Sequence, residues 1–215
     1  MKRTDYFFLF LLFLYWCCNS ADTTKKNLIP SSILTAAYRK IDSTKPFIKN
    51  GDVIFRNGRD EVSQAARSMN RKDTSFSHCG LVFIEHDSVF VYHALGGSYN
   101  PSQKLKRELL GSFCSPLENN AFGLYRYNLK KEEIEKLKSV VNSYYKAGLK
   151  FDMYFNYFSD DVMYCSEFVF KSLNKSVNGV YNKYIRLDTL PYGVTTDDIF
   201  LNENCRLIMR QRFGW

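Results

Sequence analysis

The chain of 215 residues is 45% hydrophobic and 24% charged, and it carries a formal net charge of +8. This composition is typical of a globular protein of about one domain, and it excludes a collagen-like or largely disordered chain. A basic surface favours anionic partners. The positive charges are dispersed along the sequence, however, so we expect no nucleic acid among the partners of this protein.

The first 18 residues have the pattern of an export signal. Two basic residues precede an apolar run of 11 residues from Tyr6 to Trp16. A bilayer-spanning helix needs about 20 apolar residues, so this shorter run is typical of a signal peptide. Cys17 and Cys18 follow it and resemble the lipidation site of bacterial lipoproteins, although the usual small residue before the cysteine is missing. We expect an exported protein of the periplasm or cell envelope, either lipid-anchored at one of these cysteines or cleaved nearby by an ordinary signal peptidase.

The remaining sequence predicts one α+β domain. Residues 19–44 have the composition of a polar tether followed by a helix after Pro30, and residues 45–215 form the predicted domain. Apolar residues that alternate or run together predict strands, and apolar residues three and four positions apart predict helices. In chain order these patterns predict a strand at 53–55, a helix at 60–70, strands at 78–85, 88–95 and 123–127, helices at 130–146 and 165–174, and a strand at 206–209. The strands cluster in the middle with helices around them, which favours an α+β fold.

Two of the three histidines lie on neighbouring predicted strands. With His86-Asp87 as a two-residue turn between the strands, Gly80 pairs with His93. His78 then lies diagonal to His93 on the same face of the sheet, about 7–8 Å away at the backbone. A slip of one residue would place the two side chains on opposite faces, and either could instead be a structural histidine of the sheet.

Cys165 precedes an apolar helical pattern, so we expect it in the first turn of a helix. A free thiol has a pKa of about 8.5, and a helix N-terminus or a neighbouring imidazolium lowers it to roughly 3.5–7.5. The thiolate then becomes the main species at neutral pH. The sequence thus offers Cys165 as a nucleophile with a histidine as its base. The alternative is a buried core cysteine, which is what most free cysteines are.

The other cysteines of the domain match no zinc-binding pattern, and we expect neither a metal nor a cofactor. Cys79 adjoins His78, but successive side chains of a strand point to opposite faces, so Cys79 is expected to be a small core residue. An oxidising compartment would permit one disulfide, and Cys114 with Cys205 is the favoured pair. Sequence spacing does not establish that pairing.

Four motifs, taken in order, resemble those of one enzyme family. They are Gly-Asp-Val-Ile-Phe at 51–55, Phe-Ser-His-Cys-Gly-Leu-Val at 76–82, Val-Tyr-His-Ala at 91–94 and Tyr-Cys-Ser-Glu-Phe-Val at 164–169. They are similar to those of the YiiX/YebB-like branch of the NlpC-type cysteine hydrolases, which have a circularly permuted papain-like fold. The resemblance covers about residues 45–210. It implies a small antiparallel sheet packed against the helix that begins at the cysteine.

The same resemblance implies a catalytic role for three residues. Cys165 falls on the nucleophile of the family and His78 on its general base. His93 falls on the third position, which orients the base and where many relatives carry an acid. The implied reaction is acyl transfer, in which the thiolate attacks an amide carbonyl and His78 protonates the leaving amine.

The implied function is hydrolysis of amide bonds in cell-wall peptide or another envelope substrate. Tyr164, Tyr154 and Phe155 are candidates for contact with the substrate, with packing in the core as the alternative. A second enzymatic interpretation is lipid acyl hydrolysis or transfer, as in lecithin:retinol acyltransferase-like proteins. A non-catalytic envelope binding module or a structural lipoprotein is also compatible with the export signal. The sequence leaves the exact substrate and the oligomeric state open.

Overall fold

The structure, a computed structural model, describes residues 29–214. Nearly all of the described residues belong to one compact unit, Ser32–Trp215, the second of the two units into which the chain divides. The predicted signal peptide, with Cys17 and Cys18, lies outside the described residues. Within the described part of the chain, no helix is both long enough and apolar enough to cross a membrane.

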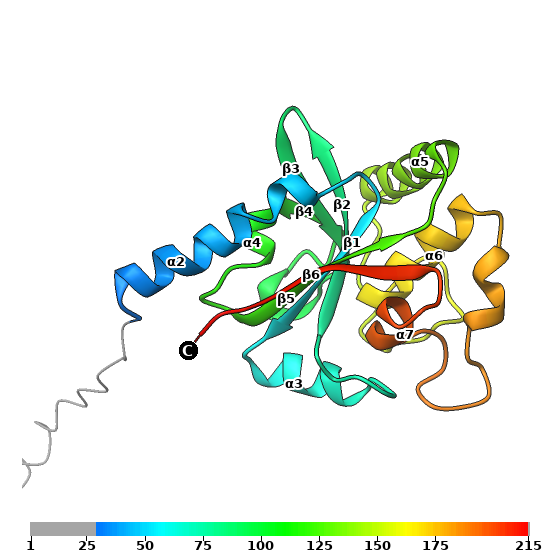
Figure 1. Cartoon of the computed structure of the whole chain (residues 1–215). Helices are drawn as coiled ribbons and strands as arrows, with labels where there is room; N and C mark the ends of the chain where they lie inside the picture. Colours follow the sequence, from blue (N-terminus) through cyan, green and yellow to red (C-terminus); the bar gives the residue numbers. More distant parts are fainter. Residues whose placement is uncertain (1–28, 215) are drawn as a thin grey trace, which may run out of the picture. The chain divides into compact units, whose positions relative to one another are not determined.

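A six-stranded antiparallel sheet forms the centre of the second unit, with the strand order β4-β3-β2-β1-β5-β6 (Figure 1). The strands are β1 (Asp52–Gly58), β2 (His78–Glu85), β3 (Ser88–His93), β4 (Lys106–Leu109), β5 (Asn119–Tyr127) and β6 (Cys205–Arg212). The sequence patterns predicted all of them except β4. They placed β1, β5 and β6 correctly but made all three too short.

Helices lie on both faces of this sheet (Figure 1). They are α2 (Ser31–Asp42), α3 (Glu61–Ser68), α4 (Leu110–Phe113), α5 (Lys131–Ala147), α6 (Cys165–Ser176) and α7 (Thr196–Phe200). The predicted helices after Pro30 and at 60–70, 130–146 and 165–174 are confirmed. The two shortest helices, α4 and α7, were not predicted, because four or five residues give too little periodicity to detect.

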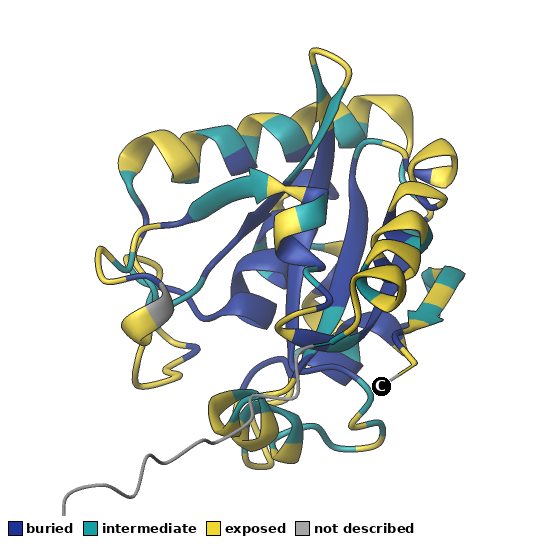
Figure 2. Cartoon of the chain, turned by 90° about the vertical axis from the view of Figure 1, so that its left-hand side faces the viewer, coloured by how far each residue is buried: buried dark blue, intermediate teal, exposed yellow. Residues whose placement is uncertain are grey.

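Each face of the sheet carries its own buried cluster. Val53 and Phe55 of β1 belong to the cluster under α5, α6 and α7, whereas Ile54 between them belongs to the cluster under α2 and α4. Figure 2 shows the result, with buried strands between helices that are exposed on their outer sides. Because both faces are covered, strand alternation decides which cluster each buried side chain in the middle of a strand joins.

The β2–β3 hairpin has the predicted two-residue turn. His86 and Asp87 both have positive φ, 47° and 62°, which matches a tight hairpin to the twist of its strands. The register pairs Glu85 with Ser88, as predicted from the turn. This register sends the side chains of His78 and His93 to the same face, where both rings pack against α4.

The favoured disulfide between Cys114 and Cys205 is not present. The four cysteines of the described residues are all free. Cys114 lies in the cluster under α2 and α4, whereas Cys205 packs against the cluster under α5, α6 and α7. The sheet therefore separates the two sulfur atoms, a fact that depends on the fold and not on their spacing in the sequence.

Candidate active site

Cys165 is the first residue of α6, and it is 9% exposed. The backbone N–H of Tyr164 donates to Oε2 of Glu167 over 3.2 Å, which closes the start of the helix. Glu167 is itself buried, and its Oε1 atom lies 2.8 Å from Nζ of Lys171. The N–H groups of the first turn and the helix dipole favour negative charge at this point. The local sequence thus places the thiol where a thiolate is stabilised.

His78 begins β2, and its side chain interacts with Cys165, each shifting the pKa of the other. Its Nε2 atom lies 2.8 Å from Nδ1 of His93, so Nδ1 of His78 is the nitrogen left for the thiol. Both imidazole rings are buried and pack against the ring of Phe113 from α4. The structure therefore brings together the three residues that the sequence proposed for catalysis.

Glu108 of β4 extends this series of contacts by one residue. Its Oε1 atom lies 2.9 Å from Nε2 of His93, a close polar contact, and its Oε2 atom lies 3.1 Å from Nζ of Lys106, with which it forms an ion pair. Burial acts to raise the pKa of Glu108, but His93 and Lys106 lower it to about 2. The carboxylate is thus ionised at neutral pH. The sequence patterns missed Glu108 because three of the four residues of β4 are charged and give no strand signal.

Burial controls the charge of both histidines. It lowers the pKa of His78 to about 4 and that of His93 to about 4, because a buried imidazolium loses its hydration. Arg56 of β1 repels a positive charge on either ring and lowers both pKa values further, whereas Cys165 raises that of His78 and Glu108 raises that of His93. At neutral pH both rings are neutral, so His78 is able to accept a proton.

Cys165, unlike the two histidines, is favoured in its charged form. A hydrogen bond from Cys79, together with the charge of His78 and a hydrogen bond with it, holds the pKa of Cys165 well below its ordinary value, although burial acts to raise it. The proton can therefore move from sulfur to nitrogen inside one contact, without a net charge entering the buried site.

Cys79 lies on the α6 side of the sheet and is fully buried, which confirms its prediction as a core residue. Its contact with the nucleophile was not predicted. The thiol and the backbone N–H of Cys79 are both hydrogen-bonded to Cys165, and burial raises the pKa of Cys79 itself well above the ordinary value. Cys79 thus remains a neutral thiol that can donate to a thiolate. The contact between Cys79 and Cys165 depends on the packing of α6 against β2, which the sequence patterns do not reveal.

Two adjoining hollows are both lined by Cys165, and they also share Ala66, Ser77 and Phe155. The larger is a cavity of about 510 Å³, and its lining includes Arg56, His78, Met153, Phe155 and Cys165. The smaller, of about 40 Å³, is lined by Cys165 together with residues of α6 and of the two segments 191–196 and 66–77, but not by His78. The two hollows at the thiol therefore differ in size, and only the larger one is lined by the base.

The three aromatic residues proposed for substrate contact have different positions. Tyr164 is buried and lines the smaller hollow, and Phe155 borders both hollows. The two rings are in contact, with their centroids 5.4 Å apart. Tyr154 is 92% exposed and lines neither hollow. The structure thus brings Tyr164 and Phe155 to the thiol and leaves Tyr154 outside.

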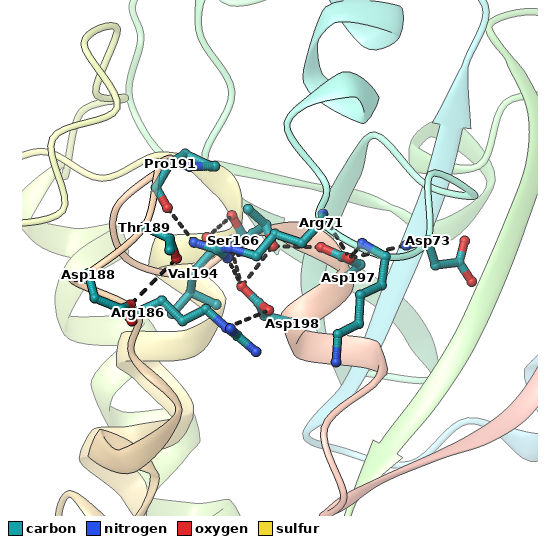
Figure 3. Close-up of polar contacts among 12 residues, drawn as sticks. Arg71, Asp73, Ser166, Arg186, Asp188, Thr189, Pro191, Val194, Asp197 and Asp198 are labelled. Atoms are coloured by element: carbon teal, nitrogen blue, oxygen red, sulfur yellow. Dashed lines mark hydrogen bonds and ion pairs between the residues drawn. The ribbon is translucent and has the colours of Figure 1, made fainter.

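A network of polar contacts holds the 186–195 segment beside the smaller hollow (Figure 3). The carboxylate of Asp197 accepts three backbone N–H bonds from residues 71–73, at 3.0, 2.6 and 3.2 Å. The guanidinium of Arg71 binds Asp198 and the carbonyl oxygen of Pro191. The hydroxyl of Ser166, next to the nucleophile, donates to the carbonyl of Val194 over 2.9 Å. These contacts fix one wall of the site to the start of α6.

The chain matches, over residues 47–196, the model of a family described as permuted papain-like amidase enzymes, YaeF/YiiX, C92 family. The chain belongs to this family. The matched span is well over half of the chain and includes Cys165, His78, His93 and Glu108. The resemblance drawn from the four motifs is thereby confirmed, and so is the expected permuted papain-like α+β fold with its antiparallel sheet.

Two proteins of Escherichia coli are similar to this chain. The protein of strain K12 named uncharacterized protein YiiX is 29% identical over 126 residues, which are 57% of this chain and 56% of that protein. The match thus spans about half the length of this relative. The crystal structure of yiiX from strain O157:H7 has a TM-score of 0.58 at 19% identity, covering 76% of this chain and 98% of that chain. Its likeness supports the fold.

The O157:H7 protein is described as a metalloprotein. Metal ions in proteins are commonly held by three or more His, Cys, Asp or Glu side chains. Residues 29–214 of this chain contain no such group arranged to hold a metal ion. His78 and His93 are directed at each other, with Nε2 and Nδ1 2.8 Å apart, and therefore do not present a ligand set.

Proposed function

We propose that this protein is a thiol-dependent hydrolase of amide bonds, with Cys165 as its nucleophile and His78 as its general base. One observation carries the proposal. The thiol at the start of α6 contacts a buried imidazole whose other nitrogen lies 2.8 Å from a second imidazole. A nucleophile held by a base that is itself oriented by a third group is the general arrangement of covalent hydrolases.

The reaction follows from this arrangement. His78 takes the thiol proton on Nδ1, and the sulfur of Cys165 attacks the carbonyl carbon of an amide. The backbone N–H of Cys165, unpaired in the first turn of α6, is a donor for the developing oxyanion. His78 then gives its proton to the leaving nitrogen as the C–N bond breaks. Water, deprotonated by His78, releases the acyl group as a carboxylic acid and restores the thiol.

The tautomer of His78 is set by its partners. For Nδ1 to accept the thiol proton, the hydrogen of the neutral ring must lie on Nε2 and be donated to Nδ1 of His93. The hydrogen of His93 then lies on Nε2, the atom that faces Glu108. His93 and Glu108 are positioning residues in this scheme, and they keep the base in the form that the first step requires.

The substrate that we propose is cell-wall peptide or another amide of the cell envelope. The family of amidases supports the type of bond, and the export signal predicted at residues 1–18 supports the location. The protein would then act in the periplasm or envelope, with lipid attachment at Cys17 or Cys18 as an additional proposal.

A second candidate is hydrolysis or transfer of a lipid acyl group. The observation that favours it is the apolar lining of the cavity beside the thiol, where Val62, Leu117, Met153 and Phe155 are all at least 40% exposed. Exposed apolar residues gathered at one cavity commonly mark a binding site. Digestion of muropeptides, compared with release of fatty acid from lipid esters, distinguishes the two candidates.

The reactivity of Cys165 tests the proposal without a known substrate. We expect alkylation of Cys165 by iodoacetamide to stay fast down to about pH 5, because contacts with Cys79 and His78 lower the pKa of Cys165. In the His78→Ala variant the rate at low pH should fall at least tenfold. Peptide mass spectrometry assigns the modified cysteine, and Cys165→Ala is the control for alkylation elsewhere. A wild-type rate that follows an ordinary thiol, and is unchanged in His78→Ala, would contradict the proposal.

A further inference from the structure

Arg56 is a cation beside the base that the proposed reaction does not use. In the register of β1 and β2 it pairs directly with His78, so the two side chains leave the sheet on the same face. Its guanidinium lies over the ring of Phe113, 4.8 Å from the centroid, and its Nη1 donates to the carbonyl oxygen of Phe113 over 3.1 Å. The same ring packs against His78. Arg56 is thus held in place by a neutral residue.

Most N–H donors of the Arg56 guanidinium make no hydrogen bond to the described residues. Within the described residues, the Arg56 guanidinium makes one hydrogen bond, from Nη1 to the carbonyl oxygen of Phe113. No carboxylate of these residues lies within ion-pair distance of it. Two acidic residues line the same cavity, but Asp60 caps α3 by bonding Ser63, and Glu118 forms no ion pair with Arg56. A half-buried guanidinium with free donors therefore faces a cavity that is otherwise mainly apolar.

The position of Arg56 is unfavourable for the free enzyme. Its charge acts against the imidazolium that His78 must become during the reaction. An anion bound to Arg56 would neutralise this charge and remove the penalty. Arginine binds carboxylates through two parallel N–H bonds, and such charge-assisted pairs are stronger than neutral hydrogen bonds. The substrate is the natural source of the anion, since the cavity that Arg56 lines also contains the thiol.

The role of His78 in the reaction indicates whether the acyl half or the amine half of the substrate carries the anion. His78 must protonate the leaving nitrogen, so the amine half lies on the His78 side of the thiol. The larger cavity includes both His78 and Arg56, whereas the smaller hollow includes neither. The acyl half is therefore left for the hollow beside Tyr164.

We propose that Arg56 binds a carboxylate on the amine half of the substrate, so that the leaving group is an amino acid or a peptide with a nearby carboxylate. The apolar lining of the cavity, with Met153 and Phe155, would receive the side chain of that amino acid. This inference rests on the proposed function, because it assigns the subsites from the roles of Cys165 and His78.

Two alkylating reagents of nearly equal size test the inference. Iodoacetate carries a carboxylate, and iodoacetamide carries a neutral amide in its place. We expect the ratio of their rates at Cys165, iodoacetate over iodoacetamide, to fall about tenfold in Arg56→Gln, as loss of one charge-assisted contact implies. Arg56→Lys keeps the charge and should retain part of the preference. Arg210→Gln is the matched control, because this guanidinium also lies over a phenylalanine ring, 5.0 Å from the centroid of Phe76, but does not line the cavity.

A second measurement needs no variant. N-acetylated amino acids with a free carboxylate should protect wild-type Cys165 from iodoacetamide better than their C-terminal amides do. Equal protection by both series, or an equal rate ratio in wild type and Arg56→Gln, overturns the role of Arg56. If wild-type Cys165 reacts with both reagents as an ordinary thiol, the proposed function itself fails. The two failures are therefore distinguishable.

Discussion

The active site has two walls that are built differently. The strand wall carries Arg56, His78 and His93 on β1, β2 and β3, where backbone pairing sets each position. The loop wall consists of the segments 151–163 and 186–195, which contain little regular structure. Two part-buried cationic side chains, Lys171 of α6 and Arg71, hold these segments in place. Lys171 binds the carbonyl oxygens of residues 157 and 159 at 3.0 and 2.7 Å, and the network around Arg71 holds the other segment.

This difference separates chemistry from recognition. A strand can shift only by whole residues, and a shift of one residue would turn each side chain to the other face. The strand wall therefore keeps the base and its partners within hydrogen-bond distance. The loop wall is free of this constraint and presents exposed apolar residues, such as Phe158 and Tyr192. We infer that substitutions of His78 and His93 in the strand wall alter the rate of the reaction, whereas substitutions in the loop wall, and of Arg56, alter binding.

The strongest test of this separation is His93→Gln. Glutamine can occupy much of the same space but cannot hold His78 in one tautomer as the ring of His93 does. We expect kcat/KM to fall roughly 10³-fold, mostly through kcat, by analogy with loss of the orienting group of a catalytic triad. Circular dichroism should show an intact fold. A loss of less than tenfold would mean that His93 does not orient the base.

Glu108→Gln should have the next largest effect. A neutral His93 carries no negative charge, so the carboxylate of Glu108 is what stabilises an imidazolium in this series of contacts. Its loss should lower kcat/KM about 10–100-fold, as expected for a group one contact removed from the base. Since the imidazolium is then less stable, alkylation of Cys165 should also slow at low pH.

Glu85→Gln is the matched control for Glu108. Its carboxylate forms an ion pair with Arg107 in the same sheet, and both glutamate side chains are 18% exposed. Glu85 touches neither histidine. Equal loss of activity in the two variants would show that β4 needs its ion pairs for folding only, and that Glu108 has no role in positioning.

The smallest expected effect is an opposite dependence of stability on pH at His93 of the strand wall and at Glu167 of α6, whose partner Lys171 holds the loop wall. Burial lowers the pKa of His93 to about 4, so the unfolded chain binds the proton more readily and stability is lost as the pH falls from about 6.5 to 4. Burial raises the pKa of Glu167 to about 7, so its contribution is present at low pH and is lost as the pH rises through 7.

Urea unfolding at pH 7 and pH 5 measures these contributions. Because the pKa of His93 is lower in the folded state, acidification from pH 7 to pH 5 decreases the free energy of unfolding by about 2 kcal/mol through this residue. His93→Gln should therefore lose less stability on acidification than wild type, and Glu167→Gln should lose more. For each protein, the free energy of unfolding at pH 5 is compared with that at pH 7. A destabilisation by the substitution that is equal at both pH values therefore cancels. The same pH dependence in all three proteins would contradict the assignment of these shifts to burial.

Much of the fold and part of the site could be predicted from the sequence. Long apolar runs gave the central strands, and the His86-Asp87 turn gave a register that is observed. Cys165 could be placed at a helix start because apolar spacing begins just after it. The edge strand β4 could not be predicted, since its charged residues pair through the backbone with β3 and need no apolar pattern. Glu108 was missed with it.

The sequence by itself determined the local elements, the motifs of the family and the two residues offered as nucleophile and base. These depend on the spacing of apolar residues within one helix or strand, which follows from backbone geometry and from which side of the element is buried. Only the tertiary structure decided that Cys79 contacts Cys165, that Arg56 stands opposite His78, and that Cys114 and Cys205 are separated by the sheet. Each of these is a relation between residues that are far apart in the chain or on different faces. Strand register and the packing of α6 fix such relations, and neither is encoded by any one segment.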